Sequence, residues 1–170
     1  MESGGAVSYS GIDLYVTGFG KFQGVAKNPT TDLVEWLQKK CAESPHPRVE
    51  LCFSDIVTVS TSQCNAALEN IKKGIMKQIQ KRNEMQEEQS SGTSNERKIL
   101  VVNFGVNASA SAFNLEKVGR NLCDFRCPDE EGVQLKDHAI DSSFGKEHCR
   151  ETRINVELLS EKLGKKGHVV

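Results

Sequence analysis

The sequence predicts an α/β protein with a twisted, mostly parallel sheet covered by helices on both faces, in a three-layer α/β/α arrangement. Segments with strand character alternate with segments of helical periodicity along the chain. One run, 99–104, is almost continuously apolar, which is typical of a central strand covered on both faces. A chain of 170 residues buries roughly 70% of its unfolded surface, enough for one core. We therefore expect a single domain over residues 1–170.

The first half of the chain begins with an expected strand at 12–17, where β-forming residues alternate up to Gly18. Asn28 and Pro29 then predict a helix start, since Asn is a favoured N-cap and Pro is tolerated at the first helical position. Pro45 should stop this helix. Its apolar face is expected to consist of Leu33, Val34, Trp36, Leu37 and Cys41.

The rest of the chain continues the alternation. A strand over 49–59 precedes a helix from Thr61 or Ser62 to about Arg82. Polar residues 84–97 read as a flexible surface loop. The stripe of the long helix is expected to be Leu68, Ile71, Ile75 and Ile79. After the central strand, we expect a loop-rich stretch over 107–153, a helix over 154–166 and the start of a strand at 168–170.

The charge balance limits the partners of this protein. Lys and Arg total 22 against 23 Asp and Glu, so the chain lacks the basic excess that binding a phosphate backbone requires. No run of residues has the 18 or more apolar positions of a membrane span, and the first residues do not resemble a signal peptide. We expect a cytoplasmic protein that binds neither nucleic acid nor membranes.

The six cysteines are expected to be reduced thiols in a protein without a secretion signal. Cys123 and Cys127 are four apart and could share a helix face with a zinc ion, but no CxxC pair or second ligand pair accompanies them. The favoured interpretation is small, partly buried apolar side chains. We expect no metal and no cofactor.

The glycine-rich segment YVTGFGKFQGVAKNP, residues 15–29, resembles a phosphate loop only superficially. Its glycines are spaced G-x-G-x-x-x-G, one residue longer than the dinucleotide fingerprint, and the Walker motif is absent. A nucleotide-binding α/β domain rests on this loop alone. Phe19 and Phe22 either plug the loop onto the core or line a flat apolar slot at the carboxyl edge of the sheet, where ligands bind in open α/β folds.

Two segments together, TGFGKFQGVAKNP and LEKVGRNLCDFRCPDEEG, resemble the pyroglutamyl-peptidase I family of cytosolic cysteine peptidases. In that family a T-G-F-x-P-F block is followed by N-P-[ST], and a second block carries E-[RK]-x-x-x-N and R-x-P-D before a glycine. Lys21 replaces the usual proline of the first block. The matching residues are Thr17, Gly18, Phe19, Phe22, Asn28, Pro29, Thr30, Glu116, Lys117, Asn121, Arg126, Pro128, Asp129 and Gly132.

The resemblance implies a site for peptides with N-terminal pyroglutamate. Phe19 and Phe22 would line the pocket of the lactam ring, and Asn28 in the same block would be a further substrate-binding residue. Glu116 would be the acid of a Cys-His-Glu triad, and Arg126 would support the charge of the site. Val106 would lie at the substrate-binding position where bacterial members have a glutamine, and its side chain has no group that could form a hydrogen bond with the lactam.

The family places its nucleophile in an A-G-x-[FY]-[VL]-C segment that follows the last expected strand, with the histidine later still. None of the six cysteines lies in such a segment, and Cys149 beside His148 or His138 is a poor substitute. We therefore expect a C-terminally truncated chain that is inactive alone. The alternative is a non-catalytic relative that binds peptides or pairs with another subunit. The sequence does not predict an oligomeric state.

Overall fold

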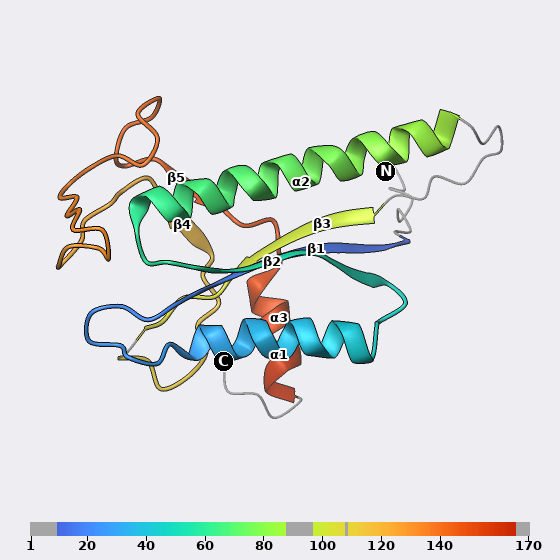
Figure 1. Cartoon of the computed structure of the whole chain (residues 1–170), viewed down its shortest axis with the longest axis horizontal. Coiled ribbons are helices and arrows are strands. Elements are labelled where there is room, and N and C mark those ends of the chain that lie inside the picture. The colour runs from blue at the N-terminus through green and yellow to red at the C-terminus, as the bar shows by residue number, and fades with distance from the viewer. Residues whose placement is uncertain (1–9, 88–96, 108, 166–170) are drawn as a thin grey trace, which may run out of the picture. The chain divides into compact units, whose positions relative to one another are not determined.

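A parallel sheet of three strands forms the centre of the first part of the protein (Figure 1). The computed structural model describes residues 10–87, 97–107 and 109–165. The strands are β1 (Gly11–Phe19), β2 (Val49–Val57) and β3 (Arg97–Asn103), in the order β2-β1-β3. Both outer strands run parallel to β1. The predicted α/β class is confirmed.

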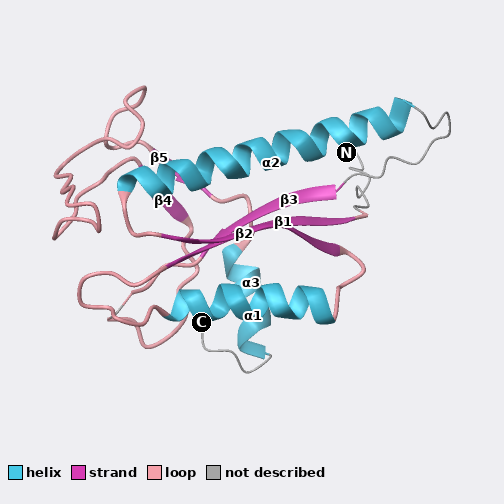
Figure 2. Cartoon of the chain, viewed as in Figure 1, coloured by secondary structure: helices cyan, strands magenta, loops and turns pink. Residues whose placement is uncertain are grey.

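Helices cover both faces of this sheet, as expected (Figure 2). Helix α1 (Pro29–Glu43) follows β1 and lies on one face, and helix α2 (Thr61–Glu87) follows β2 and lies on the other. Parallel neighbours require such crossovers, because a tight hairpin can join only antiparallel strands. The core on the α1 side is built around Leu14, Val16 and Val34.

Helix α1 begins and ends where the sequence predicts. Asn28 is the N-cap, its side chain accepts a hydrogen bond from the Thr30 amide, and Pro29 is the first helical residue. The helix ends at Glu43, before Pro45. Val34 is completely buried, whereas Trp36 is 61% exposed, so its assignment to the apolar face is wrong. Two residues along a helix turn through about 200°, which carries Trp36 away from the face that Val34 occupies.

Helix α2 differs more from the expectation. It runs to Glu87, so residues 84–87 of the expected 84–97 loop are helical, while 88–96 lie outside the described residues. Ile71 is buried as predicted, but Leu68 and Ile79 are 48% and 37% exposed. The expected stripe is therefore wrong at two of its four positions.

The face that α2 turns to the sheet carries small and polar residues instead. Ala67 and Ile71 are buried, and Gly74, Gln78 and Arg82 continue the same line as half-buried residues. A Cβ atom on Gly74 would lie 3.1 Å from the Tyr15 ring, so the glycine lets α2 approach β1 closely. Apolar periodicity could not reveal this face, because two of its residues, Gln78 and Arg82, are polar and bind polar groups of the sheet.

The central strand is β1, not the 99–104 run. All but two residues of β1 are buried, with Asp13, Tyr15 and Thr17 on the side opposite Leu14 and Val16. In the described sheet β3 pairs only with β1, and its Ile99 and Val101 are 38% and 39% exposed. The expectation that 99–104 is covered on both faces is wrong for the described residues, because they leave more than a third of each of these two side chains exposed.

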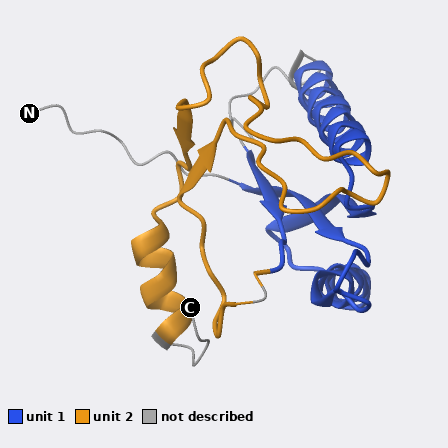
Figure 3. Cartoon of the chain, turned by 90° about the vertical axis from the view of Figure 1, so that its left-hand side faces the viewer, with its two compact units in different colours: residues 1–106 blue, residues 107–170 orange. Residues whose placement is uncertain are grey.

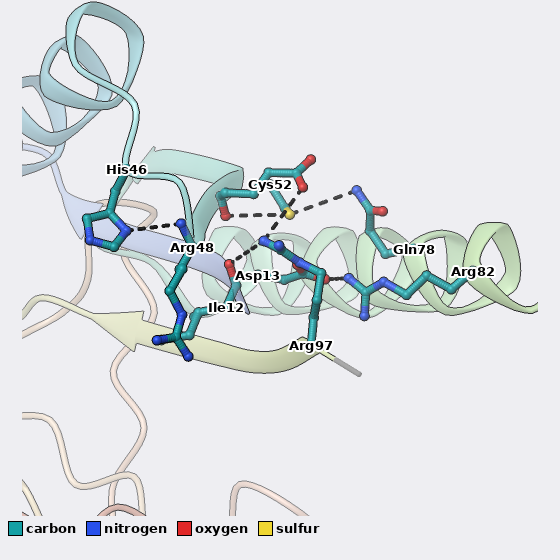
Figure 4. A network of polar contacts seen from close by, with 9 residues as sticks. Ile12, Asp13, His46, Arg48, Cys52, Gln78, Arg82 and Arg97 are labelled. Atoms are coloured by element: carbon teal, nitrogen blue, oxygen red, sulfur yellow. Dashed lines mark hydrogen bonds and ion pairs between the residues drawn. The ribbon is translucent and has the colours of Figure 1, made fainter. Parts of the chain in front are cut away.

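A buried carboxylate joins three elements at the amino end of the sheet (Figure 4). Asp13 of β1 is inaccessible to solvent and forms ion pairs with Arg82 of α2 and Arg97 of β3, the latter at 2.6 Å from Nε to Oδ1. The Arg97 guanidinium also donates to the Ile12 carbonyl at 2.8 Å. A Cβ atom on Gly11 would lie 2.4 Å from this guanidinium, so β1 begins with glycine where Arg97 crosses it.

A β-bulge in β2 brings a thiol beside this network. The register with β1 shifts between Leu14 and Tyr15, which leaves Cys52 as the extra residue. Its sulfur accepts a hydrogen bond from Gln78 of α2 at 3.8 Å, and burial raises the pKa of the thiol. The Tyr15 hydroxyl is buried near Cys52 without a partner at hydrogen-bonding geometry among the described residues.

The chain divides into two compact units, residues 1–106 and 107–170 (Figure 3). The second unit is rich in loops, as predicted, but also contains two short antiparallel strands that the sequence did not indicate, β4 (Val118–Arg120) and β5 (Cys149–Glu151). Helix α3 (Val156–Lys165) matches the helix expected over 154–166. The expected strand at 168–170 lies outside the described residues, and a single domain over 1–170 stays a prediction.

No helix in the described ranges is long and apolar enough to cross a membrane.

Replacing Asp13 by Asn should destabilise the protein by about 3 kcal/mol, because Arg82 and Arg97 would keep their charges in a largely buried place without a counter-charge. Urea unfolding measures this loss. Glu69→Gln is the matched control, since Glu69 pairs with Lys72 on the exposed side of α2 and should change stability by less than about 1 kcal/mol. Equal losses in the two variants would contradict the structural role of Asp13.

Tyr15→Phe should alter how stability depends on alkaline pH. Burial raises the pKa of Tyr15 to about 12, whereas the unfolded chain ionises a tyrosine near 10. The folded state therefore holds more protons than the unfolded state between these values, and stability falls as the pH rises from 10 to 12. Urea midpoints should fall less steeply over this range in Tyr15→Phe. Identical slopes in the two proteins would disprove the assignment.

Candidate functional site

At the start of the loop after β1, both the backbone amide and the backbone carbonyl of Phe19 form hydrogen bonds with the first turn of α1. The Thr30 hydroxyl accepts from the Phe19 amide at 2.8 Å, and the Thr31 hydroxyl donates to the Phe19 carbonyl at 2.9 Å. The next amide, that of Gly20, donates to the Val57 carbonyl at the end of β2 at 3.0 Å. These bonds fix the backbone from which the Phe19 ring projects.

Asn28 holds the other end of the same loop. Its side chain is 2% exposed, with Oδ1 accepting from the Thr30 amide and Nδ2 donating to the Gly20 carbonyl, each at 3.0 Å. One residue thus caps α1 and closes the loop. The structure gives Asn28 this framework role, and its direct contact with a substrate stays a prediction.

The glycines of the loop serve packing and turn geometry. A Cβ atom on Gly18 would lie 2.7 Å from the Thr30 carbonyl oxygen and 2.8 Å from the Val34 side chain, so only glycine lets β1 pass this close to α1. Gly24 has a φ of +82°, in the left-handed region that favours glycine. It lies within the turn in which Phe22 and Val25 exchange backbone hydrogen bonds of 3.2 and 2.8 Å.

Phe19 and Phe22 are both half-buried, so neither ring is a fully enclosed plug of the core. The strand alternation puts Phe19 on the same face of β1 as Thr17. Val106, also half-buried, follows β3 at the same edge, where the Phe104 amide donates to the Thr17 carbonyl at 2.8 Å. The first unit therefore contains four of the predicted site residues at or beyond the carboxyl ends of its strands, including Asn28.

A polar pair lies at this edge that the sequence reasoning missed. The Thr17 hydroxyl donates to Oδ1 of Asn103, the last residue of β3, at 2.7 Å. Thr17 is 5% exposed and Asn103 is exposed. The available signal was a carboxamide directly after the apolar run 99–102, but only the register shows that it lies opposite Thr17.

The other two predicted site residues belong to the second unit. Glu116 is exposed, two residues before β4, and no described residue forms a hydrogen bond or ion pair with its side chain. Arg126 is exposed too, and its carbonyl accepts from Gln134 at 3.0 Å. Their catalytic and charge-supporting roles stay predictions.

Their neighbours in the second block of the motif hold the loops together. Asn121 is 8% exposed and its Nδ2 donates to the carbonyls of Asp141, Phe144 and Gly145, while its Oδ1 accepts from the Asp141 amide at 2.7 Å. Asp129 accepts from two backbone amides on either side of Gly132, whose φ is +82°. These residues give the segment that carries Glu116 and Arg126 a defined backbone.

The structure does not place Cys123 and Cys127 on a shared helix face, and it brings no described histidine ring to the Cys149 thiol. Cys123 bridges to His138 through backbone atoms in an extended segment rather than on a helix. The Cys149 thiol donates to the Glu147 carbonyl at 3.4 Å, and the His148 ring stacks on Phe144 at 4.4 Å. No described cysteine of this unit has a histidine ring as a hydrogen-bond partner.

A possible set of cation ligands occurs in the first unit, where atoms of Asp13, Glu50 and Cys52 lie within 4.8 Å of one another. The sequence did not indicate it, because the three residues come from two strands. Asp13 is already paired with two guanidinium groups, which compete with a metal ion for its oxygens. The ion pairs of Asp13 with Arg82 and Arg97 therefore explain why this carboxylate is buried here, and we do not assign a metal site to the cluster.

A shallow pocket of about 470 Å³ lies at the opposite edge of the sheet from Phe19. It is lined by the end of α1, the start of β2 and Arg97. It contains none of the residues that the sequence indicates for binding, so we do not assign the site to it.

Together, the fold and the loop define an α/β protein with a rigid aromatic loop at the carboxyl edge of a parallel sheet, the usual place for a ligand in such folds. No family model matches the sequence. Solved structures of pyrrolidone carboxyl peptidases, also called pyroglutamyl peptidase I, do match it. The chain has the fold of these peptidases, which confirms the resemblance at the level of the fold.

Three of these structures show the extent of the similarity. The peptidase from Fervidobacterium islandicum AW-1 has 22% identity and a TM-score of 0.68 over 93% of this chain. That from Pyrococcus furiosus has 20% identity and a TM-score of 0.67 over 92%. Pyroglutamyl peptidase I from Bacillus amyloliquefaciens has 20% identity and a TM-score of 0.65 over 92% of this chain. The present chain spans 62%, 62% and 63% of their respective lengths.

Gly18→Ala should destabilise the protein by about 1–3 kcal/mol, because the added methyl group meets the backbone of α1. Gly20→Ala is the matched control two residues on, where the nearest atoms to a new Cβ are 3.9 and 4.0 Å away. Its stability should stay within about 0.5 kcal/mol of the starting protein. Urea unfolding of both variants checks this, and equal effects would contradict the close approach at Gly18.

Proposed function

We propose that this chain binds the N-terminal pyroglutamate of peptides at the β1 loop and is part of a cysteine peptidase that removes this residue. The observation that carries the proposal is the pair of half-buried phenylalanines on a loop held rigidly at the carboxyl edge of the sheet. The fold shared with pyrrolidone carboxyl peptidases supports it.

The chemistry of the ligand suits this loop. Pyroglutamate is a flat, uncharged five-membered lactam, and aromatic rings offer it apolar contact area at low cost in conformational entropy. Small-molecule sites usually combine such walls with a few fixed polar groups that set the orientation. The hydrogen bonds to Thr30 and Thr31 hold the Phe19 backbone in place before any ligand arrives, which reduces the entropy lost on binding.

The proposed reaction is attack of a thiolate on the carbonyl carbon that follows the lactam, formation of an acyl-enzyme and hydrolysis by water. Glu116 is proposed to hold the histidine of the triad in its productive tautomer and to stabilise the imidazolium form. Arg126 is proposed to balance charge near the site. Val106 is proposed to contribute apolar contact at the end of β3.

None of the six cysteines lies in the A-G-x-[FY]-[VL]-C segment that the resemblance requires for the nucleophile. Binding of the lactam is therefore the part of the function that the described residues support. We expect the 170-residue chain to bind pyroglutamyl peptides without hydrolysing them. Peptides in the cytoplasm are its proposed ligands.

Binding of pyroglutamyl-alanine to the 170-residue chain, followed by calorimetry or NMR titration, tests the proposal. Phe19→Ala and Phe22→Ala should each weaken binding by about tenfold or more, because each removes one aromatic wall. Phe113→Ala, at a phenylalanine that is 64% exposed in the second unit, is the control and should bind as the starting protein does. Prolyl-alanine, whose ring bears a charged amine instead of a lactam, should not compete.

Absence of binding by the unaltered chain, or equal binding by all three variants, would refute the proposed site. Release of aminomethylcoumarin from its pyroglutamyl amide would instead contradict the expectation that the 170-residue chain does not hydrolyse its ligand. Loss of that release after alkylation with iodoacetamide would identify the reaction as thiol-dependent.

A further inference from the structure

Asn103 supplies a feature that the two phenylalanines lack, a polar group at the edge where the lactam is proposed to bind. Aromatic walls alone do not distinguish a lactam from a carbocycle of the same size, since the difference between them is a pair of hydrogen-bonding groups. The side chain of Val106, which also follows β3, has no such group. The structure must therefore offer a donor or acceptor elsewhere if the site is specific.

The position of Asn103 is set by the register of the central strands. Asn103 is the direct partner of Thr17 across the β1–β3 pair. Because side chains alternate along a strand, Thr17 and Phe19 project from the same face of β1. Asn103 therefore lies beside Thr17, two residues before Phe19, at the face of the sheet from which Thr17 and Phe19 project.

The orientation of its carboxamide follows from one hydrogen bond. The buried Thr17 hydroxyl donates to Oδ1 of Asn103 at 2.7 Å. This leaves the Nδ2 amino group turned away from Thr17, and no described residue accepts a hydrogen bond from it. Asn103 is exposed, so the free N–H groups are available to a ligand.

The backbone around this pair is rigid. The Phe104 amide donates to the Thr17 carbonyl at 2.8 Å, which extends the parallel ladder one residue beyond Asn103. A donor held on a strand by a buried hydroxyl needs little reorganisation when it binds a carbonyl oxygen, which is the arrangement that specificity requires.

We infer that Asn103 determines specificity by donating an Nδ2 hydrogen bond to the ring carbonyl of the lactam, and that Thr17 is a positioning residue that orients this donor. The inference rests on the proposed function, since it names how the same site recognises its ligand. It assigns lactam recognition to the end of β3 through Asn103 and leaves Val106 an apolar neighbour.

The test compares two ligands on the 170-residue chain by calorimetry. Pyroglutamyl-alanine carries the ring carbonyl, and cyclopentanecarbonyl-alanine has a ring of the same size without it. Asn103→Leu should weaken binding of the first ligand by about tenfold or more and leave the second nearly unchanged. Thr17→Val should weaken the first ligand by a smaller factor, and Thr17→Ser should restore it.

Each result separates one conclusion from another. If the unaltered chain binds neither ligand, the proposed function fails. If it binds pyroglutamyl-alanine but Asn103→Leu weakens both ligands equally, or neither, the inference about Asn103 is overturned while the proposed function stands. Asn103→Asp keeps the shape of the side chain and replaces the donor by an acceptor. It should therefore lose the lactam ligand selectively even if Asn103→Leu does not fold.

Discussion

The buried carboxylate of Asp13 is the interaction on which the first unit depends. A charge without access to solvent near the amino end of a central strand is costly unless it is paired, and here a guanidinium from α2 and another from β3 pair with it. The pairing links three elements that are distant in sequence. It also explains Gly11, which lets Arg97 cross β1, and the presence of Arg82 on the face of α2 that packs against the sheet. Gln78 on the same face has a different partner, the sulfur of Cys52.

The two ends of the sheet consequently have different tasks. The amino end is held by charge, with Arg82, Arg97 and the bulge at Cys52 around Asp13 (Figure 4). The carboxyl end is held by neutral hydrogen bonds from Asn28, Thr30 and Thr31 to the loop backbone, which leave the aromatic rings partly exposed.

In the second unit, some polar residues of the motif bind the backbone of surrounding loops, whereas others have exposed side chains. The side chains of Asn121 and Asp129 form hydrogen bonds with backbone atoms of surrounding loops. Glu116 and Arg126, from the same motif, remain exposed. A motif thus contains both kinds of residue. Asp129 holds a local turn and Asn121 joins the chain to a loop 20 to 24 residues further on, whereas the side chains of Glu116 and Arg126 are exposed.

The sequence by itself determined the alternation of strands and helices from β1 to β3, the Asn28-Pro29 start of α1 and the aromatic loop, because caps, turns and alternation are local properties of neighbouring residues. Only the tertiary structure decided that β1 rather than β3 is central, that Trp36, Leu68 and Ile79 lie outward, and that Asn103 meets Thr17. Those facts depend on which strands pair and in what register. Pairing is a long-range choice, set here by the Asp13 ion pairs and the packing of Gly18 and Gly74, which no local pattern records.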